Sequence, residues 1–118
     1  MAGIKSDQLY ERAKEFALGC AKIGSVVPKT TANITYFRQL VRSSASIAAN
    51  YLEAQEALGK QDFVFRLKIC RKEAKESRYW LELLSELNHA GEKLIELQRE
   101  ADELVRIFSK SVRTTESH

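Results

Sequence analysis

Four polar side chains recur at helical spacing between residues 42 and 53. They are Arg42, Ser46, Asn50 and Glu53. At about 100° of rotation per residue, they lie within about 80° of one another on one helix face. The alternative to a functional row is a plain solvent-facing surface. The small residues Ala45 and Ala49 beside the row favour close packing against another element, in which buried Asn and Glu side chains need hydrogen-bonding partners.

A second set of side chains that could form a functional site is basic. Residues 60 to 78 carry seven Lys or Arg and three Asp or Glu, whereas residues 82 to 103 carry two basic and seven acidic side chains. On a helical projection most of the cations of the first segment share one face, here called the basic stripe: Lys68, Arg71, Lys72, Lys75 and Arg78. Such a stripe is either a solvated surface or a site for nucleic-acid phosphates. Tyr79 is the only aromatic residue near it, so we expect little preference for single-stranded bases.

Catalytic arrangements are hard to find in the sequence. The two histidines are His89, in an expected turn, and the terminal His118, so neither a Ser-His nor a Cys-His pair is visible. The carboxylates lack the Glu-x-x-His spacing of di-iron bundles, and no glycine-rich phosphate loop is present. We therefore expect no enzymatic activity, no cofactor and no metal site.

Four segments of helical periodicity must position these residues. Residues 7–23, 32–58, 62–88 and 92–110 are expected to be helices, and residues 111–118 a frayed tail. Their predicted core stripes are Leu9, Ala13, Phe16, Cys20 and Ile23; Ile34, Phe37, Val41, Ser44, Ala48, Tyr51 and Leu58; Phe63, Leu67, Cys70, Ala74, Ser77, Leu81 and Leu84; and Leu94, Leu97, Ala101, Leu104 and Phe108. Short links predict an all-α, antiparallel up-down-up-down four-helix bundle that forms one domain over residues 1–118.

The third expected helix carries a second apolar face beside its core stripe. This face consists of Phe65, Ile69, Trp80 and Leu83. Either it makes a wide core contact with two neighbouring helices, or it is buried between subunits, because exposed Trp and Phe together on a monomer promote aggregation. The sequence favours a subunit interface, so we expect a homo-oligomer.

Composition sets the remaining expectations. The chain has 118 residues, with 44% apolar and 30% charged residues and a net charge of +3, and these values are ordinary for a globular protein. Cys20 and Cys70 lie outside any Cys-x-x-Cys or Cys/His spacing, which favours two buried, reduced thiols. No apolar stretch is long enough for a signal peptide or a membrane span, so a cytoplasmic protein is expected.

Two motifs resemble a known family. "RSSASIAANYLEA" fits a signature matched by Arg42, Ser46, Ile47, Asn50, Glu53 and Ala54, and a second pattern is matched by Asp62, Phe63, Ala74, Glu76, Tyr79, Trp80 and Leu81. Together they resemble the bacterial four-helix bundle proteins named after the intervening sequences of 23S ribosomal RNA genes. The resemblance covers about residues 9 to 108.

The resemblance implies a ring-shaped homopentamer without known enzymatic activity. A related protein, the accessory variability determinant of diversity-generating retroelements, has a basic surface and works with a reverse transcriptase and its RNA. The resemblance also implies a structural or interface role for the signature residues Arg42, Ser46, Asn50, Glu53 and Glu76. Nucleic-acid binding through the basic stripe is the function we expect, and an oligomeric protein-interaction scaffold is the alternative.

Overall fold

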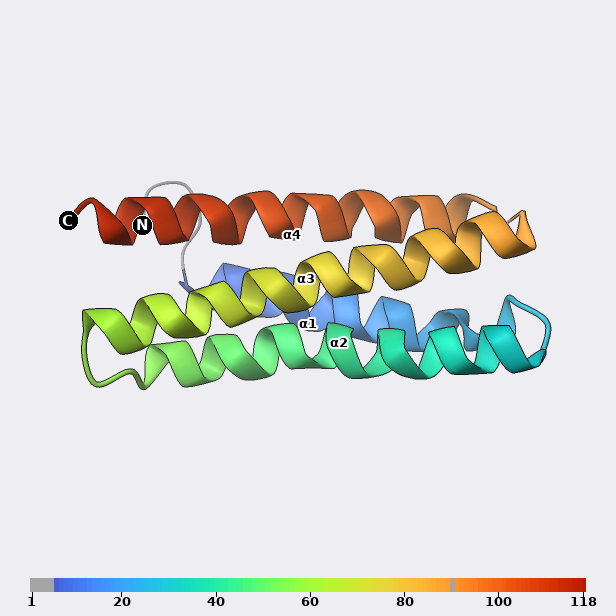
Figure 1. The fold of residues 1–118 in the computed structure, drawn as a ribbon, viewed down its shortest axis with the longest axis horizontal. Helices are drawn as coiled ribbons and strands as arrows, with labels where there is room; N and C mark the ends of the chain where they lie inside the picture. The colour runs from blue at the N-terminus through green and yellow to red at the C-terminus, as the bar shows by residue number, and fades with distance from the viewer. Residues whose placement is uncertain (1–5, 90) are drawn as a thin grey trace.

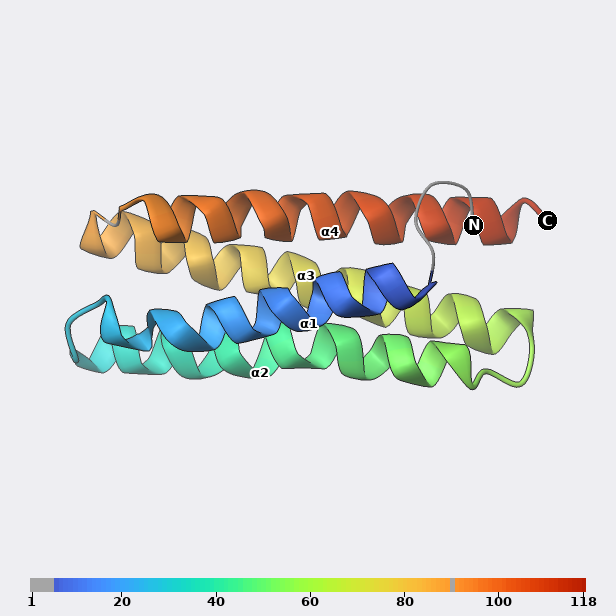
Figure 2. The same cartoon turned by 180° about the vertical axis from the view of Figure 1, so that it is seen from behind.

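The chain folds as an antiparallel bundle of helices. The computed structural model describes residues 6–89 and 91–118, and within them four α-helices follow one another up, down, up and down. They are α1 (Ser6–Lys22), which a short 3-10 turn (η1, Ile23–Ser25) extends, α2 (Thr31–Gln55), α3 (Lys60–Asn88) and α4 (Glu92–Glu116) (Figure 1). The bundle measures 47 × 22 × 20 Å. Seen from behind, α1 lies beside α2 and crosses in front of α3 (Figure 2).

Local sequence signals end and start the helices. Thr30 caps α2, because its side-chain oxygen accepts a hydrogen bond from the backbone N–H of Asn33 at 3.2 Å. Gly24, in η1, lies against Phe37, and a Cβ atom there would come within 2.7 Å of the phenyl ring. At the end of α3, His89 adopts the left-handed conformation (φ 49°) and its N–H donates to the carbonyl of Ser85. These features fold α1 back onto α2 and α3 back toward α4.

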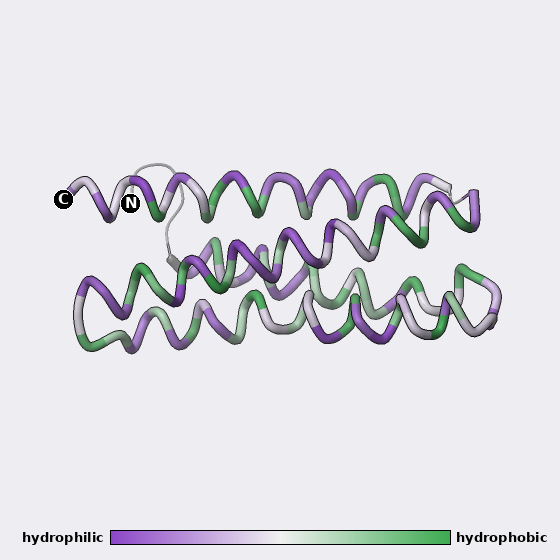
Figure 3. Tube along the Cα trace, viewed as in Figure 1, coloured by the Kyte–Doolittle hydropathy of each residue, from purple (hydrophilic) through white to green (hydrophobic). Residues whose placement is uncertain are grey.

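The core stripes predicted for the first, third and fourth helices are confirmed. Their residues are buried along the bundle axis, apart from Phe63, which is half-buried and packs against the core. Hydrophilic and hydrophobic residues alternate along each helix, as expected for helices with one buried side (Figure 3). Both cysteines are free and buried, as the sequence indicated.

The predicted stripe of α2 is partly wrong. Ile34 and Val41 are 40% and 37% exposed, and Leu58 is 98% exposed in the loop that follows α2. Leu40 and Ile47 are fully buried instead. The buried side of the first half of α2 is therefore displaced by one residue from the predicted stripe, to Asn33 and Leu40, and Ser44, Ile47, Tyr51 and Ala54 continue it at steps of three and four.

The helix ends also differ from the prediction. The fourth helix runs to Glu116, although the sequence indicated an end at residue 110 and a frayed tail. Ser111 and Val112 are buried and continue the α4 stripe, and Lys68 of α3 forms an ion pair with Glu116 at 3.3 Å. The α2–α3 loop is shifted as well, since α2 ends at residue 55 rather than 58 and α3 begins at residue 60 rather than 62.

Small and polar residues bring α2 and α3 close together. The hydroxyl oxygens of Ser43 and Ser77, both buried, lie 2.7 Å apart between the two helices. At one end of the pair, the side-chain amides of Asn33 and Asn88 donate to each other's oxygens at 2.8 Å. These bonds satisfy groups that burial would otherwise leave unpaired, and they fix the register of α2 against α3.

Candidate functional site

A hydrogen-bonded network crosses from α2 to α3, and we call it the polar seam. Its members are Arg42, Ser46 and Asn50 of α2 and Arg66, Glu73 and Glu76 of α3. The Arg42 guanidinium lies 3.4 Å from a carboxylate oxygen of Glu73 and also donates to Glu76. Ser46 donates to Glu73 at 3.1 Å. Thus three members of the polar row on α2 contact the chain's own third helix.

The remaining bonds extend the seam toward the α2–α3 loop. The Asn50 amide donates to the side-chain oxygen of Ser46 at 2.9 Å, and Arg66 donates to the amide oxygen of Asn50 at 3.4 Å. Glu53, the fourth residue of the row, is exposed, and its carboxylate forms no hydrogen bond or ion pair with a described residue. The structure therefore separates Glu53 from the three residues that precede it.

Glu73 is the most buried charged group of the seam. It is 8% exposed, and its carboxylate accepts hydrogen bonds from one guanidinium and one hydroxyl. Both partners come from α2, so satisfying this buried carboxylate of α3 depends on the observed pairing of the two helices. Within the described residues, the seam therefore links α2 to α3 through charged and polar side chains.

The basic stripe of α3 contacts α4 through its first and last residues. Lys68 pairs with Glu116 at 3.3 Å, and Arg78 pairs with Asp102 at 2.7 Å. The other three stripe residues, Arg71, Lys72 and Lys75, form no ion pair with any residue in the described part of the chain. Lys72 and Lys75 are exposed. The acidic residues of α4 thus neutralise two stripe cations and leave the three between them uncompensated.

A groove between α3 and α4 adds a cation that the sequence analysis missed. The groove has a volume of about 420 Å³ and is lined by Lys75, Arg78, Tyr79, Glu82, Gln98, Arg99 and Asp102. Arg99 lies in a segment of the sequence that is mainly acidic, so it was not recognised as part of a basic site. Only the antiparallel packing of α4 on α3 places it beside the stripe.

The second apolar face of α3 is divided by the fold. Trp80 packs against the core and stacks on Tyr36 of α2, with ring centroids 6.0 Å apart, and its indole N–H donates to Glu76. Ile69 and Leu83 are half-buried. Phe65 is 57% exposed. Trp80 thus contributes to the core contact between α2 and α3, whereas Phe65 is open to solvent.

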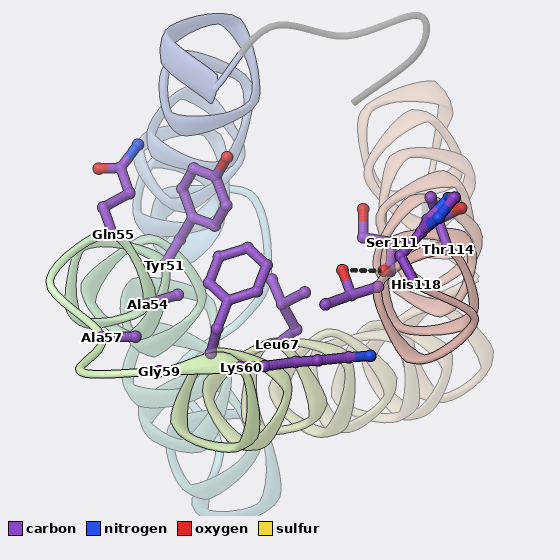
Figure 4. A pocket seen from close by; sticks show the side chains of 12 residues that line it. Tyr51, Ala54, Gln55, Ala57, Gly59, Lys60, Leu67, Ser111, Thr114 and His118 are labelled. Atoms are coloured by element: carbon purple, nitrogen blue, oxygen red, sulfur yellow. Dashed lines mark hydrogen bonds between the residues drawn. The ribbon is translucent and has the colours of Figure 1, made fainter.

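A larger cavity of about 750 Å³ lies at the end of the bundle where α2 ends and α3 begins. Tyr51, Phe63 and Leu67 supply its apolar wall, while Lys60 reaches along the rim toward α4 (Figure 4). Its described lining residues come from α2, α3, α4 and the adjoining chain, and none comes from α1. None of these lining residues is Asp or Glu.

Within residues 6–89 and 91–118, no three His, Cys, Asp or Glu side chains are grouped in a way that could hold a metal ion. Over the same residues, none of the helices combines the length and apolar character needed to cross a bilayer.

Comparison with known proteins places these features in a wider group. A family description, 23S rRNA-intervening sequence protein, matches residues 5–110. The chain is also similar to the crystal structure of a protein of unknown function from the S23 ribosomal protein family of Bacteroides thetaiotaomicron. That similarity has a TM-score of 0.82 and 26% sequence identity, and it covers 93% of this chain and 99% of the other. No curated protein matches the chain.

Proposed function

The chain belongs to the family of 23S rRNA-intervening sequence proteins, and from this premise we propose that it is a non-enzymatic, oligomeric bundle that binds the phosphate backbone of RNA or DNA through the basic stripe. The observation that carries the proposal is the group of uncompensated cations on α3. Arg71, Lys72 and Lys75 have no carboxylate partner among the described residues. The phosphates of a nucleic acid are anions that would compensate the charges of these three cations.

The energetics of such a contact come mainly from released counterions. Each Lys or Arg that neutralises a phosphate frees condensed cations from the nucleic acid, so affinity falls steeply with salt. In this protein Lys68 and Arg78 already share their charge with Glu116 and Asp102. A single subunit therefore offers few free cations, and its affinity at physiological salt should be low. Several stripes on one particle would engage one strand at high effective concentration.

The combined substitution Lys72→Glu and Lys75→Glu should lower the affinity for a mixed-sequence RNA by at least about tenfold. Both side chains are exposed, so the helix should remain intact. The slope of log K against log salt concentration should fall by about one for each lysine that binds a phosphate in the wild type. Fluorescence anisotropy of a labelled strand at several salt concentrations measures both effects.

The matched control is the combined substitution Lys22→Glu and Lys29→Glu. It makes the same change in net charge at two exposed lysines near the end of α1, away from the stripe. We expect this variant to bind within about threefold of the wild type, because only the overall field changes. If both double variants bind as the wild type does, the stripe is a solvated surface, and the protein-interaction scaffold becomes the better proposal.

Assembly is the second part of the proposal, and we expect the pentamer that the family resemblance implies. The support for it is that Phe65, 57% exposed, and the half-buried Ile69 lie one turn apart on the same face of α3. Light scattering of the wild type should give five times the 13.4 kDa mass of one chain. Phe65→Glu should lower that mass, whereas Leu18→Glu, at an exposed leucine of α1, should not. A wild-type particle of monomer mass would contradict assembly, and a stable dimer would contradict the pentamer.

A further inference from the structure

The groove between α3 and α4 combines charge with an aromatic ring. Lys75 and Arg99 enter it from the two helices, and neither forms an ion pair with a described residue. Arg78 also lines the groove, with its charge shared with Asp102 at 2.7 Å. Asp102 is bound by Arg106 as well, at 3.0 Å, which leaves Glu82 as the only unpaired carboxylate of the described lining. The groove therefore favours an anion close to Lys75 and Arg99.

Tyr79 provides a flat apolar surface at the same groove. The residue is 50% exposed, and its ring centroid lies 5.1 Å from that of Trp80 at an angle of 57°. Trp80 in turn stacks on Tyr36 of α2. A chain of three rings thus runs from the partly buried Tyr36 through Trp80 to Tyr79, and it supports the Tyr79 ring from one side.

We infer that this groove holds one nucleotide of a single strand, with the base stacked on Tyr79 and an adjoining phosphate bound by Lys75 and Arg99. The inference rests on the proposed nucleic-acid function and narrows it to unpaired bases, since a base inside a duplex presents no free face to an aromatic ring. It reverses the sequence-based expectation that single-stranded bases would be recognised weakly. That expectation treated Tyr79 in isolation, whereas the fold brings Arg99 to it from α4, and the ring of the adjacent Trp80 packs against it.

The test separates stacking from charge. A mixed-sequence single strand of about ten nucleotides is compared with an abasic strand that has the same number of phosphates. Wild-type protein should bind the strand with bases about tenfold more tightly, because one base–aromatic stack is worth about that factor. Trp80 is the only tryptophan of the chain, and its fluorescence should change with the first strand only. Tyr79→Phe should keep the preference, because it keeps the ring.

Tyr79→Leu is the decisive variant, because it preserves apolar bulk and removes the π-face. It should bind both strands equally, with the affinity of the wild type for the abasic strand. Equal wild-type affinity for the two strands would overturn the inference, and this comparison needs no variant to fold. If Lys72→Glu with Lys75→Glu still weakens binding in that case, the proposed function stands without the stacking site. If the wild type binds neither strand, both proposals fail.

Discussion

Raising the pH from 8 to about 10.5 should lower the free energy of unfolding by roughly 4 kcal/mol through the two buried thiols alone. Burial disfavours the thiolate and raises the pKa of Cys20 from 9.0 to about 12, and the pKa of Cys70 is raised to about 12 for the same reason. In the unfolded chain both thiols ionise above pH 9, whereas in the folded protein they keep their protons. The contribution of the two protonated thiols to the free energy of unfolding is therefore fully present below pH 9 and is lost as the pH rises toward 12.

Each pH unit above the ordinary thiol pKa of 9.0 costs about 1.36 kcal/mol per thiol until the raised pKa is reached. At pH 10.5, roughly 1.5 units above 9.0, the loss is therefore roughly 2 kcal/mol for each thiol. Urea unfolding at a series of pH values measures it. The control is the variant Cys20→Ala with Cys70→Ala, which leaves the titrating lysines and tyrosines in place. Its stability should fall by about 4 kcal/mol less over the same range. Equal losses for the two proteins, or rapid reaction of the folded wild type with a thiol reagent at pH 8, would show that the thiols are accessible.

The second large effect is expected at the polar seam. Arg42→Ala should destabilise the protein by about 2 kcal/mol, because it removes the cation beside Glu73, which is only 8% exposed. The expected loss of stability is smaller than for a fully buried ion pair, because the Arg42 side chain is 48% exposed and water screens its charge. Denaturant unfolding of purified variants measures the change.

Arg38→Ala is the matched control for this prediction. Arg38 lies one turn earlier on α2, is exposed, and forms no ion pair with the described residues, so its loss should cost less than about 0.5 kcal/mol. Adding Glu73→Gln to Arg42→Ala should recover much of the lost stability, because it removes the buried negative charge that Arg42 no longer compensates. An Arg42→Ala variant as stable as Arg38→Ala would mean that the seam contributes nothing to folding.

The sequence by itself determined the fold class and most of the core. The alternating steps of three and four residues in α1, α3 and α4 place their apolar side chains on one side, and this local periodicity decides which residues are buried. The cap of α2 is local as well, because Thr30 accepts its hydrogen bond from Asn33, only three residues later. The same local reasoning failed in the first half of α2, where Asn33 and Leu40 are buried in place of Ile34 and Val41.

The candidate sites depended on contacts between segments that are distant in the sequence, and only the tertiary structure decided these. It placed Arg42 and Ser46 against Glu73 of α3, although the polar row alone allowed a subunit contact as well. It also set the acidic helix directly beside the basic stripe, so that Asp102 and Glu116 neutralise two of its cations while Arg99 joins the rest. Helical periodicity fixes the direction of a side chain relative to its own helix, but the partner that it meets depends on how far each helix is rotated and shifted against the next.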